Sequence, residues 1–140
     1  MFRHVGIVVK NLKKQLYFYK NILGFEVYYD KIEKGKFVNE ILNLSNSEIH
    51  ILKLGINGKP IIELLKFLNE KTKTTSKRVN SCGITHVAIT VNNLDNVYVN
   101  LLKNKIKTFS KPKISENNKH KVLFCLDYEK NILELVENLS

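Results

Sequence analysis

The sequence predicts an α+β protein built from two tandem copies of one βαβββ module. Residues 4–12 (HVGIVVKNL) and 86–94 (HVAITVNNL) are identical at six of nine positions, at an offset of 82. Each copy then continues into a stretch with apolar residues at helical spacing. Each half also closes on an apolar strand that carries one glutamate, IIELL at 61–65 and ILELV at 132–136. Together these features indicate an internal duplication.

The first module is predicted to begin with a β-branched strand at residues 3–9. In the helix that follows, Asn11 is the expected N-cap and Gly24 the left-handed residue that ends it. Its apolar stripe consists of Leu12, Leu16, Tyr19 and Leu23. Three more strands and a short extra helix are expected, the strands at 25–32, 48–54 and 60–66 and the helix at 37–42. Asn57-Gly58 predicts a tight hairpin turn between the last two strands.

The second module is predicted to repeat this order after a polar linker. The expected boundaries are residues 1–68 for the first module, 69–82 for the linker and 83–140 for the second module. A strand at 84–91 leads into a helix capped by Asn93. The remaining strands are expected at 107–110, 120–126 and 132–137, with a turn at 127–131.

Length and cysteine content favour a reduced, soluble protein. The chain of 140 residues is 44% hydrophobic, which is ordinary core material for one compact domain. No apolar run approaches the ~20 residues of a membrane span, and no signal-peptide pattern is present. Cys82 and Cys125 lie 43 residues apart, which fits neither a disulfide framework nor a cysteine zinc site. We therefore expect a cytoplasmic location.

The basic charge does not by itself indicate a nucleic-acid partner. Lys and Arg outnumber Asp and Glu by 23 to 13, for a net charge of +10, but 21 of the 23 cations are lysines. They are scattered along the chain and accompany no recognised nucleic-acid motif. Lys, Asn and Ile share A/T-rich codons, so codon bias explains much of the excess. Neither nucleic acid nor a membrane is an expected partner.

Four polar residues interrupt the apolar pattern of the predicted strands. Strand alternation places His4 and His86 on the face opposite the helix, next to the small residues Gly6 and Ala88. Glu63 and the equivalent glutamate, Glu134, each have apolar neighbours on their own face. A carboxylate in such surroundings is costly to bury without a partner. A metal ion would remove that cost.

The repeat predicts one metal site with His4, Glu63, His86 and Glu134 as ligands. A lone histidine in a strand is more often structural, but here both histidines occupy one repeat position and both glutamates another. The mixed N/O set favours Zn, Ni, Co, Mn or Fe(II). Such an ion polarises a carbonyl, and a glutamate that detaches can act as a base. The other two histidines have no repeat equivalent and are expected to be surface or structural residues: His50 and His120.

Several segments carry a family resemblance that covers essentially the whole chain. They are HVGIVV (4–9), YFYKNILGF (17–25), IELL (62–65), GITHVA (83–88) and NILEL (131–135). In them the sequence resembles the vicinal oxygen chelate superfamily, which contains glyoxalase I, methylmalonyl-CoA epimerase, bleomycin and fosfomycin resistance proteins and extradiol dioxygenases. The resemblance implies one glyoxalase-like domain, in which the modules curl into a half-barrel of curved mixed sheet with helices on its outer face. The turn at 127–131 departs from the family pattern because it lacks the usual Pro and Gly.

The resemblance also implies a metal-dependent reaction. The family ligand positions fall on His4, Glu63, His86 and Glu134, and this full set resembles the glyoxalase I and epimerase branches. Enzymes of those branches abstract a proton beside a metal-bound carbonyl. By this resemblance Glu134, or Glu63 opposite it, is the expected base. The implied protein is a lyase or isomerase with Ni, Co, Zn or Mn. Its substrate is expected to be a small anionic molecule, a glutathione or other thiol adduct or a CoA thioester.

Two other functions remain open on the same fold. One is an Fe(II) extradiol-type dioxygenase, and the other is a non-catalytic resistance protein that binds a drug or metabolite. For a substrate carboxylate, only Arg3 and Arg78 could form a bidentate anchor. A homodimer is expected, and the sequence allows the metal site to lie within one chain or across two.

Overall fold

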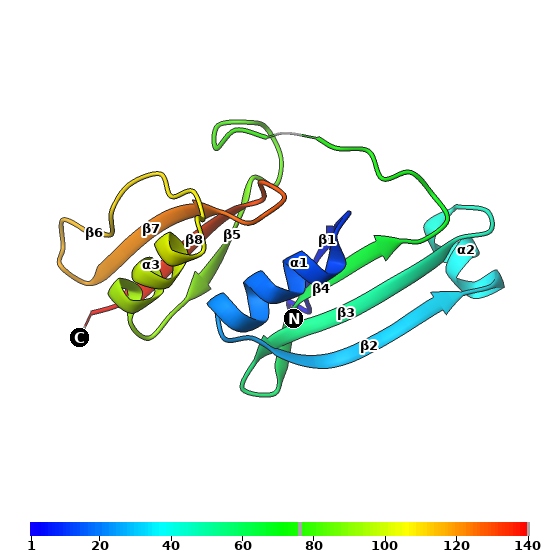
Figure 1. Cartoon of the computed structure of the whole chain (residues 1–140), viewed down its shortest axis with the longest axis horizontal. Coiled ribbons are helices and arrows are strands. Elements are labelled where there is room, and N and C mark those ends of the chain that lie inside the picture. The colour runs from blue at the N-terminus through cyan, green and yellow to red at the C-terminus, as the bar shows by residue number, and fades with distance from the viewer. Residues whose placement is uncertain (76, 140) are drawn as a thin grey trace. The chain divides into compact units, whose positions relative to one another are not determined.

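The computed structural model describes residues 1–75 and 77–139, and the chain divides into two compact units, Met1–Thr74 and Thr75–Ser140. Each unit contains one four-stranded mixed sheet, with strand orders β1-β4-β3-β2 and β5-β8-β7-β6 (Figure 1). In both sheets the first strand of the unit pairs in parallel with the last, and the other pairs are antiparallel. The predicted α+β class and the tandem βαβββ modules are confirmed. The division between the units falls inside the predicted linker.

The first unit contains all the predicted elements, with shifted boundaries. The elements are β1 (Val5–Val8), α1 (Leu12–Tyr17), η1 (Phe18–Ile22), β2 (Glu26–Lys34), α2 (Lys36–Leu42), β3 (Glu48–Ile56) and β4 (Lys59–Phe67). The predicted single helix after β1 is an α-helix that continues as a π-helical turn, η1. Three of its five residues are buried hydrophobic side chains, Phe18, Tyr19 and Ile22. A π turn changes which side chains face the sheet, and simple helical periodicity does not predict such a turn.

The predicted caps and the hairpin turn are confirmed. The Asn11 side chain accepts a hydrogen bond from the Lys14 backbone N–H at 2.9 Å, and Gly24 has φ +79°. Asn57 and Gly58 both have positive φ, at 53° and 75°. Two successive left-handed residues form the type I′ turn that suits a tight hairpin. They fix the register between β3 and β4, and β4 carries Glu63.

The second unit repeats the order, and its last three strands are shorter than those of the first unit. Its elements are β5 (His86–Thr90), α3 (Leu94–Lys103), β6 (Lys113–Ile114), β7 (His120–Leu126) and β8 (Ile132–Asn138). Asn93 caps α3 as predicted, accepting from the Asn96 N–H at 2.9 Å. No helix within the described residues is long and apolar enough to cross a membrane.

The edge of the second sheet differs from the prediction. The strand expected at 107–110 is reduced to an isolated bridge between Thr108 and Cys125, and the edge strand is β6. Pro112 lies between the two pairing segments and has no N–H to donate to a ladder. The edge of the sheet is therefore interrupted there.

Each sheet has one closed face and one more open face. Alternate residues of the strands form the core beside α1 and η1 in the first unit and beside α3 in the second. The opposite faces carry the histidines and glutamates singled out above. In the first unit α2 also lies over that second face, where Val38 packs with Ile49 and Ile51. Figure 1 shows α2 near the ends of β2 and β3.

Candidate metal centre

His4 and Glu63 form one pair in the first unit. The parallel register of β1 and β4 sets Gly6 opposite Glu63, so His4 lies diagonally across from the glutamate. The distance from His4 Nε2 to Glu63 Oε2 is 2.8 Å. Lys53, the cross-strand partner of Glu63 on β3, places its Nζ 3.8 Å from the other carboxylate oxygen.

His86 and Glu134 form the equivalent pair in the second unit. Ala88 lies opposite Glu134 in the same parallel register, and His86 Nε2 is 3.5 Å from Glu134 Oε2. The cross-strand partner of Glu134 on β7 is Phe124, and its ring lies 5.3 Å from the imidazole in an edge-on arrangement. The repeat therefore produces two His–Glu pairs of the same design.

Both pairs are accessible from the open face of their sheet. The His4 and Glu63 side chains are 25% and 14% exposed, and those of His86 and Glu134 are 36% and 26% exposed. Gly6 and Ala88, the small neighbours of the histidines, are exposed as well. An ion or a small molecule could therefore approach either pair.

The donor atoms of each pair fit two neighbouring positions around a divalent metal. Two ligands bound side by side at about 2.1 Å from one ion lie about 3.0 Å apart at octahedral angles and about 3.4 Å apart at tetrahedral angles. The observed distances of 2.8 and 3.5 Å lie close to this range. Among the described residues no group of three or more His, Cys, Asp or Glu side chains is found. The structure brings together the two members of each pair.

The surroundings of the two glutamates differ. Glu63 has the Lys53 ammonium beside it, and that ammonium also lies over the Tyr29 ring at 4.8 Å. A hydrogen bond to Glu33 raises the pKa of Tyr29, which holds this phenol neutral. Glu134 has an aromatic ring in place of the cation. The sequence analysis missed this difference, although aligning the strands that precede the glutamates would have set Lys53 against Phe124.

The other two histidines lie outside these pairs. His50 Nε2 is 2.6 Å from Asp30 Oδ1, and His120 Nδ1 is 3.1 Å from Asn138 Oδ1. Each therefore bonds within its own sheet, across neighbouring strands, as expected for surface or structural residues.

The turn before β8 holds its shape without the Pro and Gly expected from the family pattern. The buried Asp127 accepts hydrogen bonds from the backbone N–H groups of Glu129 and Asn131 and from the Asn131 side chain. Lys130 takes the left-handed conformation, with φ 68°, that glycine favours. One aspartate thus organises the turn that leads into the strand carrying Glu134.

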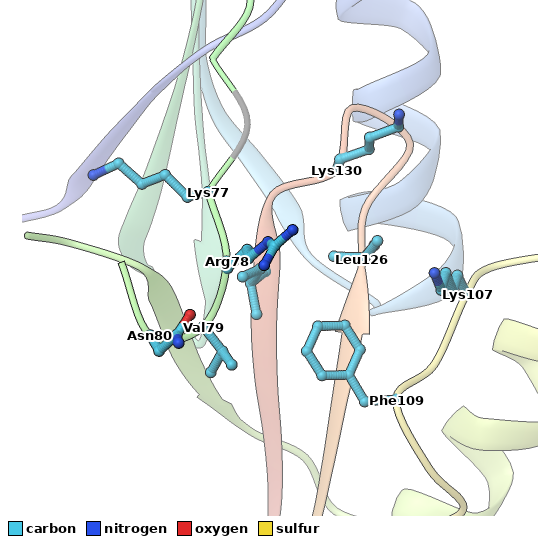
Figure 2. Close-up of a pocket in the computed structure, with 9 residues that line it drawn as sticks. Lys77, Arg78, Val79, Asn80, Lys107, Phe109, Leu126 and Lys130 are labelled. Atoms are coloured by element: carbon cyan, nitrogen blue, oxygen red, sulfur yellow. The ribbon is translucent and has the colours of Figure 1, made fainter. Parts of the chain in front are cut away.

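The second unit also contains a pocket that the sequence analysis did not predict. Its volume is about 510 Å³. Lys77, Arg78, Val79 and Asn80 come from the predicted linker, and the other lining residues come from the sheet and its loops: Lys107, Phe109, Leu126, Lys130 and Ile132 (Figure 2). Only Arg78 had been singled out from the sequence, as one of two arginines that could anchor a carboxylate.

Comparison with known proteins identifies relatives of this chain. It is 33% identical over 109 residues to the mitochondrial methylmalonyl-CoA epimerase of Homo sapiens, covering 76% of this chain and 55% of that protein. It is 29% identical over 107 residues to the uncharacterized protein YwkD of Bacillus subtilis, covering 75% of this chain and 72% of that protein. The chain therefore spans about half the length of the human enzyme.

The fold is shared with solved structures. A glyoxalase family protein from Bacillus cereus superposes with a TM-score of 0.89 at 21% identity, over 99% of this chain and 93% of that one. The sequence profile of the Glyoxalase/Bleomycin resistance protein/Dioxygenase superfamily matches residues 3–124. This match includes His4, Glu63 and His86 and ends before Glu134. The chain belongs to the glyoxalase/bleomycin resistance protein/dioxygenase superfamily.

Proposed function

We propose that this protein is a metal-dependent lyase or isomerase of the glyoxalase type. Its metal would be one divalent ion, Ni, Co, Zn or Mn, with His4, Glu63, His86 and Glu134 as the ligands. The reaction would abstract a proton beside the carbonyl of a small anionic substrate, a thiol adduct or a CoA thioester. The observation that carries the proposal is the pair of His–Glu clusters at equivalent positions of the two modules. Similarity to an epimerase of CoA thioesters supports it.

The ion supplies Lewis acidity, which makes a proton next to the substrate carbonyl more acidic. The two imidazoles hold their positions at the start of the first strand of each module. Lys53 gives Glu63 an ion-pair partner in addition to His4, which holds this carboxylate in place. Among the described residues no lysine or arginine lies within ion-pair distance of Glu134, and its polar neighbour is the His86 imidazole. Glu134 is therefore the carboxylate freer to move, and we assign it the role of base.

The direct test is proton exchange into solvent at the carbon beside the carbonyl. The metal-loaded protein is incubated in D₂O with hemithioacetals and acyl-CoA thioesters, and deuterium incorporation is followed by NMR. Glu134→Gln should lower the exchange rate by roughly 10²- to 10⁴-fold while the metal stays bound, because an amide oxygen can still ligate but cannot accept the proton. Glu116→Gln, at an exposed glutamate remote in sequence from both pairs, is the matched control.

Three results would overturn parts of the proposal. Full exchange in Glu134→Gln together with loss in Glu63→Gln would move the base to the first unit. Bound iron with oxygen consumption on catechols would replace the reaction with ring cleavage. Failure to bind any divalent metal would leave a binding protein on the same fold.

The proposed assembly is a homodimer, in which the ligand set is completed either within one chain or between two. Light scattering of the purified protein with and without metal tests this part. A monomer at all concentrations, with metal bound, would assign the whole ligand set to one chain.

A further inference from the structure

We infer that the pocket of the second unit binds the charged end of an organic anion, a phosphate or carboxylate group attached to an apolar body. The inference builds on the proposed function, because this pocket would select the substrate whose carbonyl reaches the His86–Glu134 pair. Its volume of about 510 Å³ lies within the range of small-molecule sites, about 300–1,000 Å³.

The charge of the pocket has one sign. Four of its nine lining residues are cationic, Lys77, Arg78, Lys107 and Lys130, and none is acidic. Within the described part of the chain none of these four makes an ion pair. The Lys77 ammonium donates to the Ile84 carbonyl at 3.0 Å. The other three cations are left to meet a ligand.

The pocket also has an apolar part. Val79, Phe109, Leu126 and Ile132 supply its hydrophobic surface. Figure 2 shows the Phe109 ring beside Leu126. Arg78 lies on one side of these two residues and Lys107 on the other, whereas the Lys77 side chain points away from them. A lining that combines cations with apolar side chains suits a ligand that carries both a charge and a hydrocarbon part. A bare inorganic anion would contact the cations alone.

The pocket is connected to the His86–Glu134 pair through shared side chains. Ile132 lines the pocket and is the register partner of His86 on the neighbouring strand. Phe109 stacks on Phe124 with ring centroids 6.1 Å apart, and Phe124 in turn contacts the His86 ring. Glu134 follows Ile132 by two residues and so projects from the same face of β8. An anion held in the pocket would therefore extend its apolar part toward the proposed metal ligands.

Binding of defined probes to the full chain tests this inference. Phenyl phosphate and benzoate carry the two candidate anions on an apolar ring, whereas inorganic phosphate lacks the ring and benzyl alcohol lacks the charge. Calorimetric titration should show binding of one or both ring-bearing anions and much weaker binding of the other two probes. Because the cations are exposed, affinity should fall several-fold between about 20 and about 200 mM salt.

Charge-removing variants locate the site. Arg78→Gln should weaken binding by roughly tenfold, since it removes a bidentate charge-assisted contact, and Lys107→Gln should weaken it less. Lys111→Gln removes the same charge from an exposed position outside the pocket and should leave binding unchanged. Equal effects of all three substitutions, or probe binding that survives Arg78→Gln and Lys107→Gln together, would overturn the assignment. Circular dichroism confirms that each variant is folded.

Metal titration separates this inference from the proposed function. His86→Ala should lose metal and keep phenyl phosphate or benzoate binding, whereas Arg78→Gln should keep metal and bind the probe roughly tenfold more weakly. If the wild type binds a probe but takes up no metal, the anion-binding pocket would be supported and the proposed metal-dependent activity would be rejected. If the wild type takes up metal but binds none of the probes, the pocket would not be an anion site, and the proposed function would be unaffected.

Discussion

The two proposed carboxylate ligands have different neighbours, and we expect this difference to affect how each of them binds a metal. Glu63 shares its oxygens between His4 and the Lys53 ammonium, at 2.8 and 3.8 Å. Glu134 faces Phe124 instead. The Lys53 ammonium restrains the Glu63 side chain, but its positive charge also repels a cation bound beside it. The first unit should therefore bind the ion less tightly than its ligand set alone would allow.

Replacing Lys53 with methionine should strengthen metal binding. The ammonium is partly exposed and screened, so the gain should be modest, about two- to fivefold in the metal dissociation constant. Competition with a fluorescent chelator measures it. Lys59→Met, at the exposed end of the β3–β4 hairpin, should change nothing. Weaker metal binding in Lys53→Met would contradict this prediction and would mean that the restraint of Glu63 by the lysine outweighs the charge repulsion.

The two cysteines should differ in reactivity and in their effect on stability at high pH. Cys82 is exposed, whereas burial, with the negative charge of Asp127, raises the pKa of the Cys125 thiol to about 12. Native protein should be alkylated at Cys82 alone, and denatured protein at both. The unfolded chain loses the Cys125 proton from about pH 9, while the folded chain keeps it. This contribution to stability is therefore complete below pH 9 and lost as pH rises toward 12.

Urea unfolding at pH 8 and pH 10 measures that effect. The wild type should lose about 1 kcal/mol from this group between the two pH values, in addition to the loss from other groups. Cys125→Ala should lack this part of the decrease. An identical decrease in both proteins would show that Cys125 does not control alkaline stability.

Side-chain identities at the proposed centre were predictable from the repeat because the same residue types return at an offset of 82. Lys53 and Phe124 could not be predicted in this way, because the two modules carry different residue types at this position. The pocket was not predictable either. Its walls combine a polar segment that reads as a linker with side chains from three other places in the second unit.

At the level of elements, caps and turns followed local chemistry closely. Asn11, Asn93, Gly24 and Asn57-Gly58 all perform the roles that their side chains favour. The π turn η1 and the shortened edge at Thr108 did not follow from local pattern. The π turn coincides with the burial of Phe18 and Tyr19. The sheet edge is interrupted by Pro112.

The C-terminus of α3 offers a sharp test of element stability. The Ile106 N–H bonds to the Leu101 carbonyl and the Lys105 N–H to that of Leu102, which is the Schellman arrangement. Its left-handed position, φ 57°, is occupied by Lys105. Lys105→Gly should stabilise the protein by about 1 kcal/mol, measured by urea unfolding.

A matched substitution lies two residues earlier. Lys103→Gly falls inside the last turn of α3 and should destabilise the protein by about 1 kcal/mol. The two substitutions remove the same side chain, so opposite signs would isolate the backbone effect. Destabilisation by both would show that the Lys105 side chain itself supports the helix end.

At the scale of the whole molecule, a duplicated module explains why two His–Glu pairs of the same design exist. Each unit supplies one imidazole and one carboxylate, and two ligands alone hold a divalent ion weakly in competition with water. Four ligands on one ion would leave two positions of an octahedral shell for substrate oxygens. The proposed function therefore requires the two pairs to bind a common ion, within one chain or between two.

The measurement that tests this claim most directly is metal stoichiometry in wild type, His4→Ala and His86→Ala. Each protein is stripped with chelator, reloaded and analysed for bound metal, with circular dichroism to confirm folding. We predict about one divalent ion per chain in the wild type and loss of that ion in both variants, although each alters a different unit. Stoichiometric metal retained by either folded variant would contradict a shared centre.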